Sequence, residues 1–530
     1  MFVSKLSRPF ATLSLVLGIS GCLEGEDANA DSVLLRASRS SCVSPCSVML
    51  SIDGLQDDAT EQPFVEMGVR WDYDDPEANG TPMLRGAARF LDGRGASRTH
   101  DENTPLGLHT YVCERDACTF HPSVQVRSPD GRTETGRLEI VVQGQAAAFA
   151  GARTVCVSQA DVWDGDEPCP PDARRASTLP ALGAWESNTR YLVRRGETHP
   201  QACLQYDLEN VVIAPFGDQD APAPELLGEF GIGRDRNCGD ALPTSVDFQT
   251  EGWVRDITLT GLRVQEVGLG MAFRDVTLHD LDMDWERDEA GGRVRAVSTD
   301  ACSRRDDIDC ADVPLPRGLY LTDSRIIGSR QNPPGLNVEF LSSSCVSYFG
   351  VMNVETRVAI EHNLRLECGS RVFVAHNDMN GDHVGGQGPK NAITIRPEGH
   401  DAADMLGQMR RDTSRGFGNQ FENKFVVIKD NYLGLPGGVR NNAARITVAP
   451  TKAQDAESTY AAVVSGNVTD LSPDALPDND IVLSGRAVVC YDDNVTQTSG
   501  GCSDGGQGAI PSERYAPAVV DMPVPALPPG

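Results

Sequence analysis

The sequence predicts an all-β protein in which a β-sandwich precedes a β-solenoid. The 530 residues include 52 Gly, 33 Pro and only 6% aromatic residues, a composition typical of turns and short strands rather than of helical bundles. Residues 33–145 contain apolar runs separated by turn dipeptides, which favours a sandwich. Residues 150–505 repeat a short apolar pattern at irregular intervals, which favours a solenoid.

The N-terminus predicts an export signal. Lys5 and Arg8 precede an uncharged, mostly apolar stretch up to Ile19. A basic region followed by a roughly ten-residue apolar core is typical of a secretion signal, and it is too short to span a bilayer. The remaining chain has no uninterrupted apolar segment long enough to span a membrane.

Residues 19–22 (Ile-Ser-Gly-Cys) resemble the lipobox of bacterial lipoproteins. The resemblance implies removal of residues 1–21 and acylation of Cys22, which would anchor the chain to a membrane. Because Leu23 follows Cys22, the resemblance implies the outer membrane or the cell surface. A plain secretion signal is the alternative. Residues 22–32 are acidic and small, so we expect a solvated tether.

The cysteines predict disulfides. The chain has 15 cysteines, and the thiol of Cys22 would carry lipid, so the remaining even number can pair in an oxidising compartment. A zinc site is not favoured, because no Cys-x-x-Cys pair recurs and no His lies at ligand spacing beside a cysteine pair. Sequential pairing is the simplest connectivity, and it gives Cys42–Cys46, Cys113–Cys118, Cys156–Cys169, Cys203–Cys238, Cys302–Cys310, Cys345–Cys368 and Cys490–Cys502.

The charge balance limits the partners. The chain has 47 Lys and Arg against 76 Asp and Glu, a net charge of −29. Loss of residues 1–21 removes two basic residues and no acidic ones, which makes the mature charge −31. Because binding to nucleic acid depends on clustered positive charge, we expect no nucleic-acid partner. The lipobox resemblance implies that the membrane is met through the lipid, and the chain is expected to be a monomer.

Strands of the sandwich are expected at residues 48–52, 64–73, 124–127 and 138–142. The last two are expected to form a hairpin through residues 129–131 (Pro-Asp-Gly).

Two motifs in this region resemble a PKD-type domain, an immunoglobulin-like sandwich. Residues 71–75 (Trp-Asp-Tyr-Asp-Asp) stand where that family has Trp-Asp-Phe-Gly-Asp, and residues 109–111 (His-Thr-Tyr) belong to its closing strands. The chain departs from the pattern at Tyr73-Asp74 and in the Cys113–Cys118 segment. The resemblance implies a spacer or adhesion module without catalysis, and another Ig-like sandwich is the alternative.

The solenoid is predicted from segments that share a β-branched apolar run, a polar pair and a further apolar position. A strand, a tight polar corner and another strand in every repeat are what a right-handed parallel β-helix requires. The segments that share this pattern are 256–262, 275–281, 318–324, 349–354, 372–377, 426–431, 462–467 and 489–494.

The two ends of the solenoid also have expected features. Residues 190–196 and 210–217 resemble the first coils of pectate-lyase-like β-helices, and residues 178–186 are expected to cap the first coil. Residues 506–530 are expected to form a Pro- and Ala-rich tail.

Four of these segments carry asparagine at the same position, namely Asn377, Asn431, Asn467 and Asn494. The pattern resembles the asparagine ladder of β-helix proteins. A corner Asn tolerates left-handed backbone, and its amide can bond to the backbone and to the Asn stacked above it. The alternative is that asparagine is merely common in turns.

Candidate catalytic residues gather between residues 376 and 400. His383, Lys390, Arg396 and Glu398 would suit a β-helix lyase, in which a Lys, Arg or His removes a proton beside a uronate carboxylate neutralised by Ca²⁺. They would act only if they meet on one face, and they are otherwise ordinary polar residues of loops between coils. No metal site or cofactor is identified. Asp306-Asp307 and Asp492-Asp493 would suit Ca²⁺, but not at the spacing of a known calcium loop.

These observations predict a lipid-anchored surface protein whose β-helix binds an extended polymer, by analogy a polysaccharide, without catalysis. The main alternative is a polysaccharide lyase or glycoside hydrolase that acts in the groove of the β-helix. A surface protein without a ligand is a third possibility.

Overall fold

β-Strands make up nearly all the regular structure in the computed structural model, and all the described residues belong to one unit, Val33–Gly530. None of the described helices has the length and apolarity to span a membrane. The structure describes residues 34–53, 68–75, 104–127, 132–233, 253–270, 272–285, 295–299, 316–328, 339–343, 346–359, 361–367, 369–381, 384–385, 388–389, 391–396, 424–434, 445–448, 460–469, 481–483, 487–490 and 502–503.

The N-terminal region, residues 34–143, contains three small sheets around a buried core that includes Trp71, Tyr111 and Ile140. The resemblance to a PKD-type domain stays a prediction. The sheets are β1–β3–β5 (Leu34–Ala37, Cys46–Asp53, Leu106–Tyr111), β4–β7–β8 (Gly68–Asp72, Ser123–Arg127, Thr133–Arg137) and β2–β9–β6 (Ser41–Val43, Ile140–Gln143, Ala117–Phe120).

One predicted hairpin is wrong. Strand β7 pairs antiparallel with β8, in the register Ser123↔Arg137, instead of pairing with residues 138–142. Residues 140–143 form β9 in another sheet, between β2 and β6. Strand β8 reads Thr-Glu-Thr-Gly-Arg and is largely exposed, so it has no apolar alternation by which the sequence could reveal it.

Three of the predicted disulfides are present, Cys42–Cys46, Cys113–Cys118 and Cys156–Cys169. Cys203 is also in a disulfide. Its predicted partner Cys238, like the side chains of the other predicted pairs, lies outside the described part of the chain.

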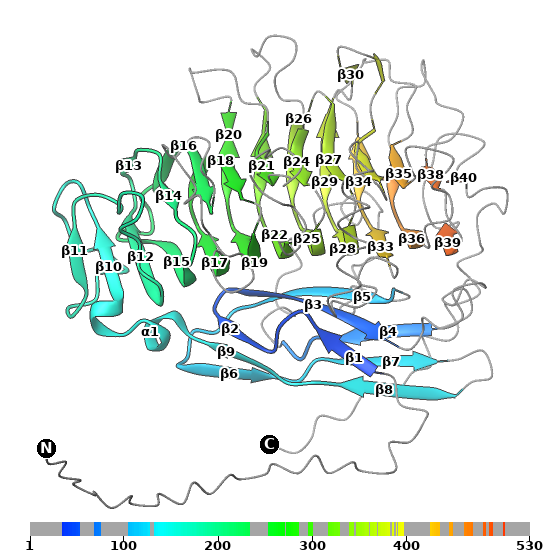
Figure 1. Ribbon diagram of the computed structural model, residues 1–530, viewed down its shortest axis with the longest axis horizontal. Coiled ribbons are helices and arrows are strands. Elements are labelled where there is room, and N and C mark those ends of the chain that lie inside the picture. The colour runs from blue at the N-terminus through cyan, green and yellow to red at the C-terminus, as the bar shows by residue number, and fades with distance from the viewer. Residues whose placement is uncertain are drawn as a thin grey trace, which may run out of the picture. The chain divides into compact units, whose positions relative to one another are not determined.

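A 12-stranded parallel sheet, here called the base sheet, forms one wall of the C-terminal region (Figure 1). All eight predicted repeats lie in it as the successive strands β17 to β39, each paired with the strand one coil away. Its strands in spatial order are β11 (Arg174–Ala176), β10 (Thr154–Val157), β12 (Thr189–Arg194), β15 (Glu209–Phe216), β17 (Val254–Thr260), β19 (Phe273–His279), β22 (Arg317–Thr322), β25 (Val346–Met352), β28 (Gly369–Ala375), β33 (Lys424–Lys429), β36 (Tyr460–Ser465) and β39 (Ala487–Cys490).

A second, 17-stranded sheet forms the remaining walls and divides into two rows after β18 (Arg263–Leu269), which pairs with both β20 and β21. Strands β13 (Thr198–His199), β14 (Cys203–Leu204) and β16 (Glu225–Ile232) precede β18. The near row is β20 (Asp282–Asp284), β23 (Arg325–Ile327), β26 (Glu355–Ala359), β29 (Asp378–Gly381), β34 (Tyr432–Gly434) and β37 (Val468–Thr469). The far row is β21 (Val297–Thr299), β24 (Glu339–Ser343), β27 (His362–Glu367), β32 (Ile393–Arg396), β35 (Ile446–Val448), β38 (Ile481–Leu483) and β40 (Cys502–Ser503).

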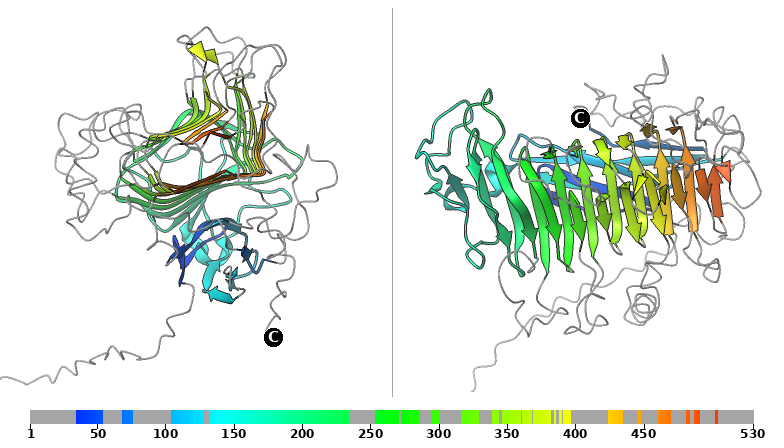
Figure 2. Two further views of the ribbon diagram at one scale, coloured as in Figure 1. Left: turned by 90° about the vertical axis from the view of Figure 1, so that its right-hand side faces the viewer. Right: turned by 90° about the horizontal axis from the view of Figure 1, so that it is seen from above.

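From β19 to β36, each coil therefore contributes a base strand, a near-row strand and a far-row strand, and successive coils stack along the chain (Figure 2). This arrangement is the predicted parallel β-helix. The chirality rule for parallel β-connections gives it the predicted right-handed sense. A short hairpin, β30 (Val384–Gly385) with β31 (Gly388–Pro389), lies between β29 and β32 in the chain.

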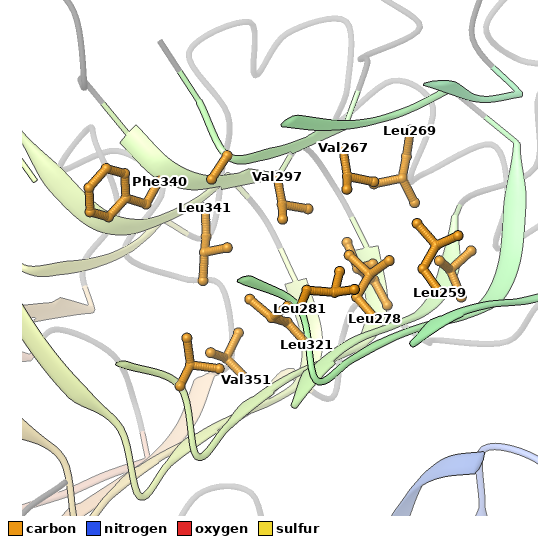
Figure 3. Packing of buried hydrophobic residues seen from close by; sticks show 14 of the residues in the cluster. Leu259, Val267, Leu269, Leu278, Leu281, Val297, Leu321, Phe340, Leu341 and Val351 are labelled. Carbon is orange, nitrogen blue, oxygen red and sulfur yellow. The ribbon is translucent and has the colours of Figure 1, made fainter. Parts of the chain in front are cut away.

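Apolar side chains from opposite walls fill the interior of the coils. Leu259, Leu278 and Leu321 from the base sheet face Val267 and Val297 from the second sheet (Figure 3). Because equivalent positions stack one coil above another, each coil buries its apolar residues against its neighbours.

The outer face of the base sheet is also buried. Met49, Leu106 and Leu108 of the N-terminal region pack there against a cluster that includes Tyr320 and Phe373. Farther along the sheet, Phe149, which follows helix α1 (Gln145–Ala148), packs in a cluster with Leu192, Val212 and Phe216. The N-terminal region is thus packed against the β-helix, whereas a spacer would stand apart from it.

Candidate functional site

The predicted catalytic cluster lies almost entirely outside the described residues. His383, Lys390 and Glu398 are not described. Arg396 is the last residue of β32 in the far row, opposite Glu367 of β27, and only its backbone is described. The catalytic roles of these four residues, like lipidation of Cys22, stay predictions.

A tight corner joins six of the base strands to the near row. Only two residues separate β19 from β20, β22 from β23, β25 from β26, β28 from β29, β33 from β34 and β36 from β37. The first of the two has left-handed backbone, which glycine adopts freely and which Asn, Asp and His adopt more readily than other residues. These corner residues are Asp280 (φ 51°), Asp323 (φ 52°), Asn353 (φ 58°), His376 (φ 59°), Asp430 (φ 52°) and Gly466 (φ 62°).

The second corner residue builds an asparagine ladder from Asn377, Asn431 and Asn467, all fully buried. Nδ2 of Asn377 donates to Oδ1 of Asn431 at 2.8 Å, and Nδ2 of Asn431 donates to Oδ1 of Asn467 at 2.9 Å. Each amide also donates to a base-strand carbonyl, that of Val351, Val374 or Ile428 in ladder order. The ladder therefore provides hydrogen-bond partners for buried backbone carbonyls of the base strands, for which the two-residue turn itself has no donors.

The place of Asn494 in the ladder stays a prediction. Strand β39 pairs with β36 in the register Val464↔Cys490, which is one residue away from a residue-by-residue alignment of segments 462–467 and 489–494. Asn494 itself lies outside the described residues.

The outer side of the corners carries a row of polar side chains over five consecutive coils, from β19 to β33. At about 4.8 Å per coil, the row is about 19 Å long. Because only two residues make each corner, no inserted loop rises from the row. We call it the corner strip, and it consists of His279, Asp280, Asp323, Asn353, His376, Lys429 and Asp430.

Side chains of the corner strip interact along its length. Nδ1 of His279 lies 3.4 Å from Oδ2 of Asp323, and Nδ2 of Asn353 donates to Oδ1 of Asp323. Nδ1 of His376 lies 3.8 Å from Oδ2 of Asp430. The side chains of these histidines and aspartates are 18–28% exposed, so they are held in place yet accessible. Such a row can exchange hydrogen bonds with a ligand through its exposed carboxylates and through His279.

Beside the corner strip, the second sheet carries a row of ion pairs. Arg263 lies between Glu225 (3.5 Å) and Asp282 (3.7 Å), and Arg325 also reaches Asp282 (3.7 Å). Farther along, Arg357 contacts Glu355 at 3.0 Å and Asp378 at 2.7 Å. We call this set, together with Asp284, which lies 4.0 Å from Arg325, the ion-pair row. Its guanidinium groups are already paired with carboxylates of the protein.

A cleft of about 510 Å³ lies where the N-terminal region meets the base sheet. Arg39 crosses this junction and donates to the Thr277 hydroxyl at 2.8 Å, and Arg317 donates to the carbonyl of Ser38 at 2.8 Å. Burial raises the pKa of Asp275, although Arg39 opposes the shift. These contacts hold the two regions together, so we assign the cleft to the junction. It is lined by Ala37, Ser38, Arg39, Ser40, Ser41, Leu138, Glu139, Arg255, Asp256, Arg274 and Asp275.

Among the residues that the structure describes, no group of three or more His, Cys, Asp or Glu is placed to hold a metal ion. A calcium site at residues 306–307 or 492–493 lies outside those residues and stays a prediction.

Sequence reasoning missed the corner strip, although its signal is present in the repeats. Asp280 and Asp323 occupy the position before the second corner residue, as His376 and Asp430 do before the ladder asparagines. Residue types that tolerate left-handed backbone recur at this position once per coil. Because the residue that follows each of them faces the interior, the recurring residues must face outward, where they form a column on the surface.

The fold and the corner strip define a parallel β-helix protein with a polar, loop-free edge. No protein-family model and no curated protein matches the chain. A solved structure, the family 28 exopolygalacturonase of Yersinia enterocolitica, aligns with 89% of this chain and 98% of its own at 9% identity. The TM-score of 0.29 is too low for this likeness to support a function.

Proposed function

We propose that the chain is a lipid-anchored cell-surface protein whose β-helix binds an extended polysaccharide along the corner strip without cleaving it. The observation that carries the proposal is the strip itself, a row of partly exposed hydrogen-bonding side chains that repeats at every coil over five coils. A repeating surface suits a repeating ligand, because each coil can make an equivalent contact and the contacts add by multivalency.

The chemistry of the corner strip suits a polyhydroxylated ligand. Carboxylates accept hydrogen bonds from hydroxyl groups, and bonds to charged groups are stronger than bonds between neutral groups. The imidazole of His279 can donate or accept, whereas Nε2 of His376 and Oδ1 of Asn353 are buried. The outer face of the base sheet is buried under the N-terminal region over much of its length, so a ligand of the β-helix must use another face.

Two features of the chain support the surface location. The disulfides need an oxidising compartment, and the lipobox-like residues 19–22 would deliver the chain there with an acyl anchor. Both observations agree with a protein that meets polymers outside the cytosol.

A retention and cleavage assay tests the proposal. The mature chain with Cys22→Ser, which cannot be acylated, is expected to be retarded in gels that contain a bound polysaccharide, while releasing no reducing ends and no unsaturated uronate absorbance with or without Ca²⁺. Retardation without products supports binding alone. Release of products would replace the proposal with the lyase or hydrolase alternative, and absence of retardation across neutral and acidic polymers would contradict polymer binding.

A further inference from the structure

The charges around the corner strip bear on which polysaccharides it can accept. Within the strip, three carboxylates (Asp280, Asp323 and Asp430) face one ammonium group, that of Lys429. Asp280 is exposed, and the side chains of Asp323 and Asp430 are 22% and 28% exposed. The Lys429 ammonium lies 3.9 Å from Asp430, so it is already drawn toward a carboxylate of the protein.

The neighbouring ion-pair row does not reverse this balance. It contains five carboxylates, those of Glu225, Asp282, Asp284, Glu355 and Asp378, against three guanidinium groups. Arg357 is held by Asp378 in a bidentate arrangement, with Nη1 at 3.0 Å and Nη2 at 2.7 Å from the two carboxylate oxygens. A ligand carboxylate would have to compete with these partners for each cation.

A polyanion would therefore meet repulsion at successive coils. Two like charges 4 Å apart repel by about 1 kcal/mol in water and by about 4 kcal/mol at the effective dielectric of a protein surface. The chain as a whole adds a net charge of −29, which also slows the approach of an anionic polymer. A neutral polymer meets none of this repulsion, and its hydroxyl groups are donors for the same carboxylates.

From this charge distribution, we infer that the corner strip selects an uncharged polysaccharide and rejects polyuronates. The inference rests on the proposed function, since it names the class of polymer for the same site. Asp323 and Asp430 act in it as acceptors for hydroxyl groups and as the charges that exclude acidic polymers.

Chemically matched polymers test the inference. Polygalacturonate and alginate are each compared with their carboxyl-reduced forms, which keep the linkages and lose the charge. At low salt, each neutral form is expected to bind at least about tenfold more tightly than its acidic parent, which corresponds to about 1.4 kcal/mol. Because the repulsion is screened, the acidic forms are expected to gain affinity at higher salt while the neutral forms change little.

The variant Asp323→Asn/Asp430→Asn separates charge from shape. Asparagine keeps the size of the side chain and tolerates left-handed backbone, so the corners should remain intact. The variant is expected to bind the acidic forms more tightly than the wild type does, so the difference in affinity between neutral and acidic forms should become smaller. The control variant Glu114→Gln/Asp116→Gln removes two negative charges as well, but from an exposed loop outside the corner strip. It should leave the difference in affinity between neutral and acidic forms unchanged.

Two failures are distinguishable. If an acidic polymer binds more tightly than its carboxyl-reduced form, in the presence or absence of Ca²⁺, the charge selectivity is wrong while polymer binding stands. If neither member of either pair binds, and neutral glucans and mannans do not bind, the proposed function is wrong as well.

Discussion

Replacing Asn431 with alanine is expected to lower the free energy of unfolding by about 3–5 kcal/mol, because several buried partners lose a hydrogen bond and each costs about 1–3 kcal/mol. Oδ1 of Asn431 accepts from the backbone N and from Nδ2 of Asn377, at 3.1 Å and 2.8 Å. Its Nδ2 donates to the carbonyl of Val374 and to Oδ1 of Asn467, both at 2.9 Å. Urea unfolding followed by circular dichroism measures the change.

Asn188 provides the matched control for the ladder. It is exposed, and its Oδ1 accepts one bond, from Nδ2 of Asn210 at 3.1 Å. Asn188→Ala is expected to lower the free energy of unfolding by about 1 kcal/mol or less. The loss combines one weak, exposed hydrogen bond with the poorer tolerance of alanine for left-handed backbone. Equal losses in the two variants would show that the ladder adds nothing beyond an ordinary turn asparagine.

The second large effect is expected from Leu108→Glu, which should release the N-terminal region from the base sheet. Leu108 is 1% exposed and lies in the cluster that contains Tyr320 and Phe373. It approaches Gly350 so closely that a Cβ added there would lie 2.6 Å from Cδ2 of Leu108. A carboxylate in this cluster would be desolvated without a partner, at a cost of several kcal/mol.

Limited proteolysis and binding of a hydrophobic dye measure the release. Cleavage between residues 144 and 153 should accelerate, and dye fluorescence should rise as the outer face of the base sheet is uncovered. Val112→Glu is the control, because Val112 lies just after β5 and is 42% exposed. Cleavage and dye binding that stay at the wild-type level in Leu108→Glu would contradict the packing of the two regions.

The sequence predicted the base sheet well because its strands carry the strongest periodic signal. Segments such as 372–375 (Val-Phe-Val-Ala) and 462–464 (Ala-Val-Val) are continuous apolar runs, as expected of parallel strands buried on both faces. The outward positions of these runs are apolar as well, which indicates that the outer face of the sheet is covered by another part of the protein. Most strands of the near and far rows could not be predicted, because strands such as β37 have as few as two residues.

The differences between prediction and structure have physical causes of the same kind. The run 487–490 (Ala-Val-Val-Cys) is apolar throughout, so the sequence allows two registers one residue apart, and in the structure Cys490 pairs with Val464. For the site, the sequence drew attention to Lys390 and its neighbours because polar and charged residues gather between residues 376 and 400. The corner strip depends instead on which residues share a corner, and that is fixed only by the pairing of strands far apart in the sequence.

The most direct test of polysaccharide binding along the corner strip is the affinity of the variant Asp323→Gly/His376→Gly/Asp430→Gly for a retained neutral polymer. Glycine already occupies the equivalent corner position at Gly261 and Gly466, with φ of 66° and 62°, so the variant removes side chains and preserves the backbone. Loss of three contacts, each worth about 0.5–1.5 kcal/mol, predicts that the dissociation constant rises by at least about tenfold while the circular dichroism spectrum stays unchanged. A dissociation constant within twofold of wild type would place the polymer elsewhere and contradict the account.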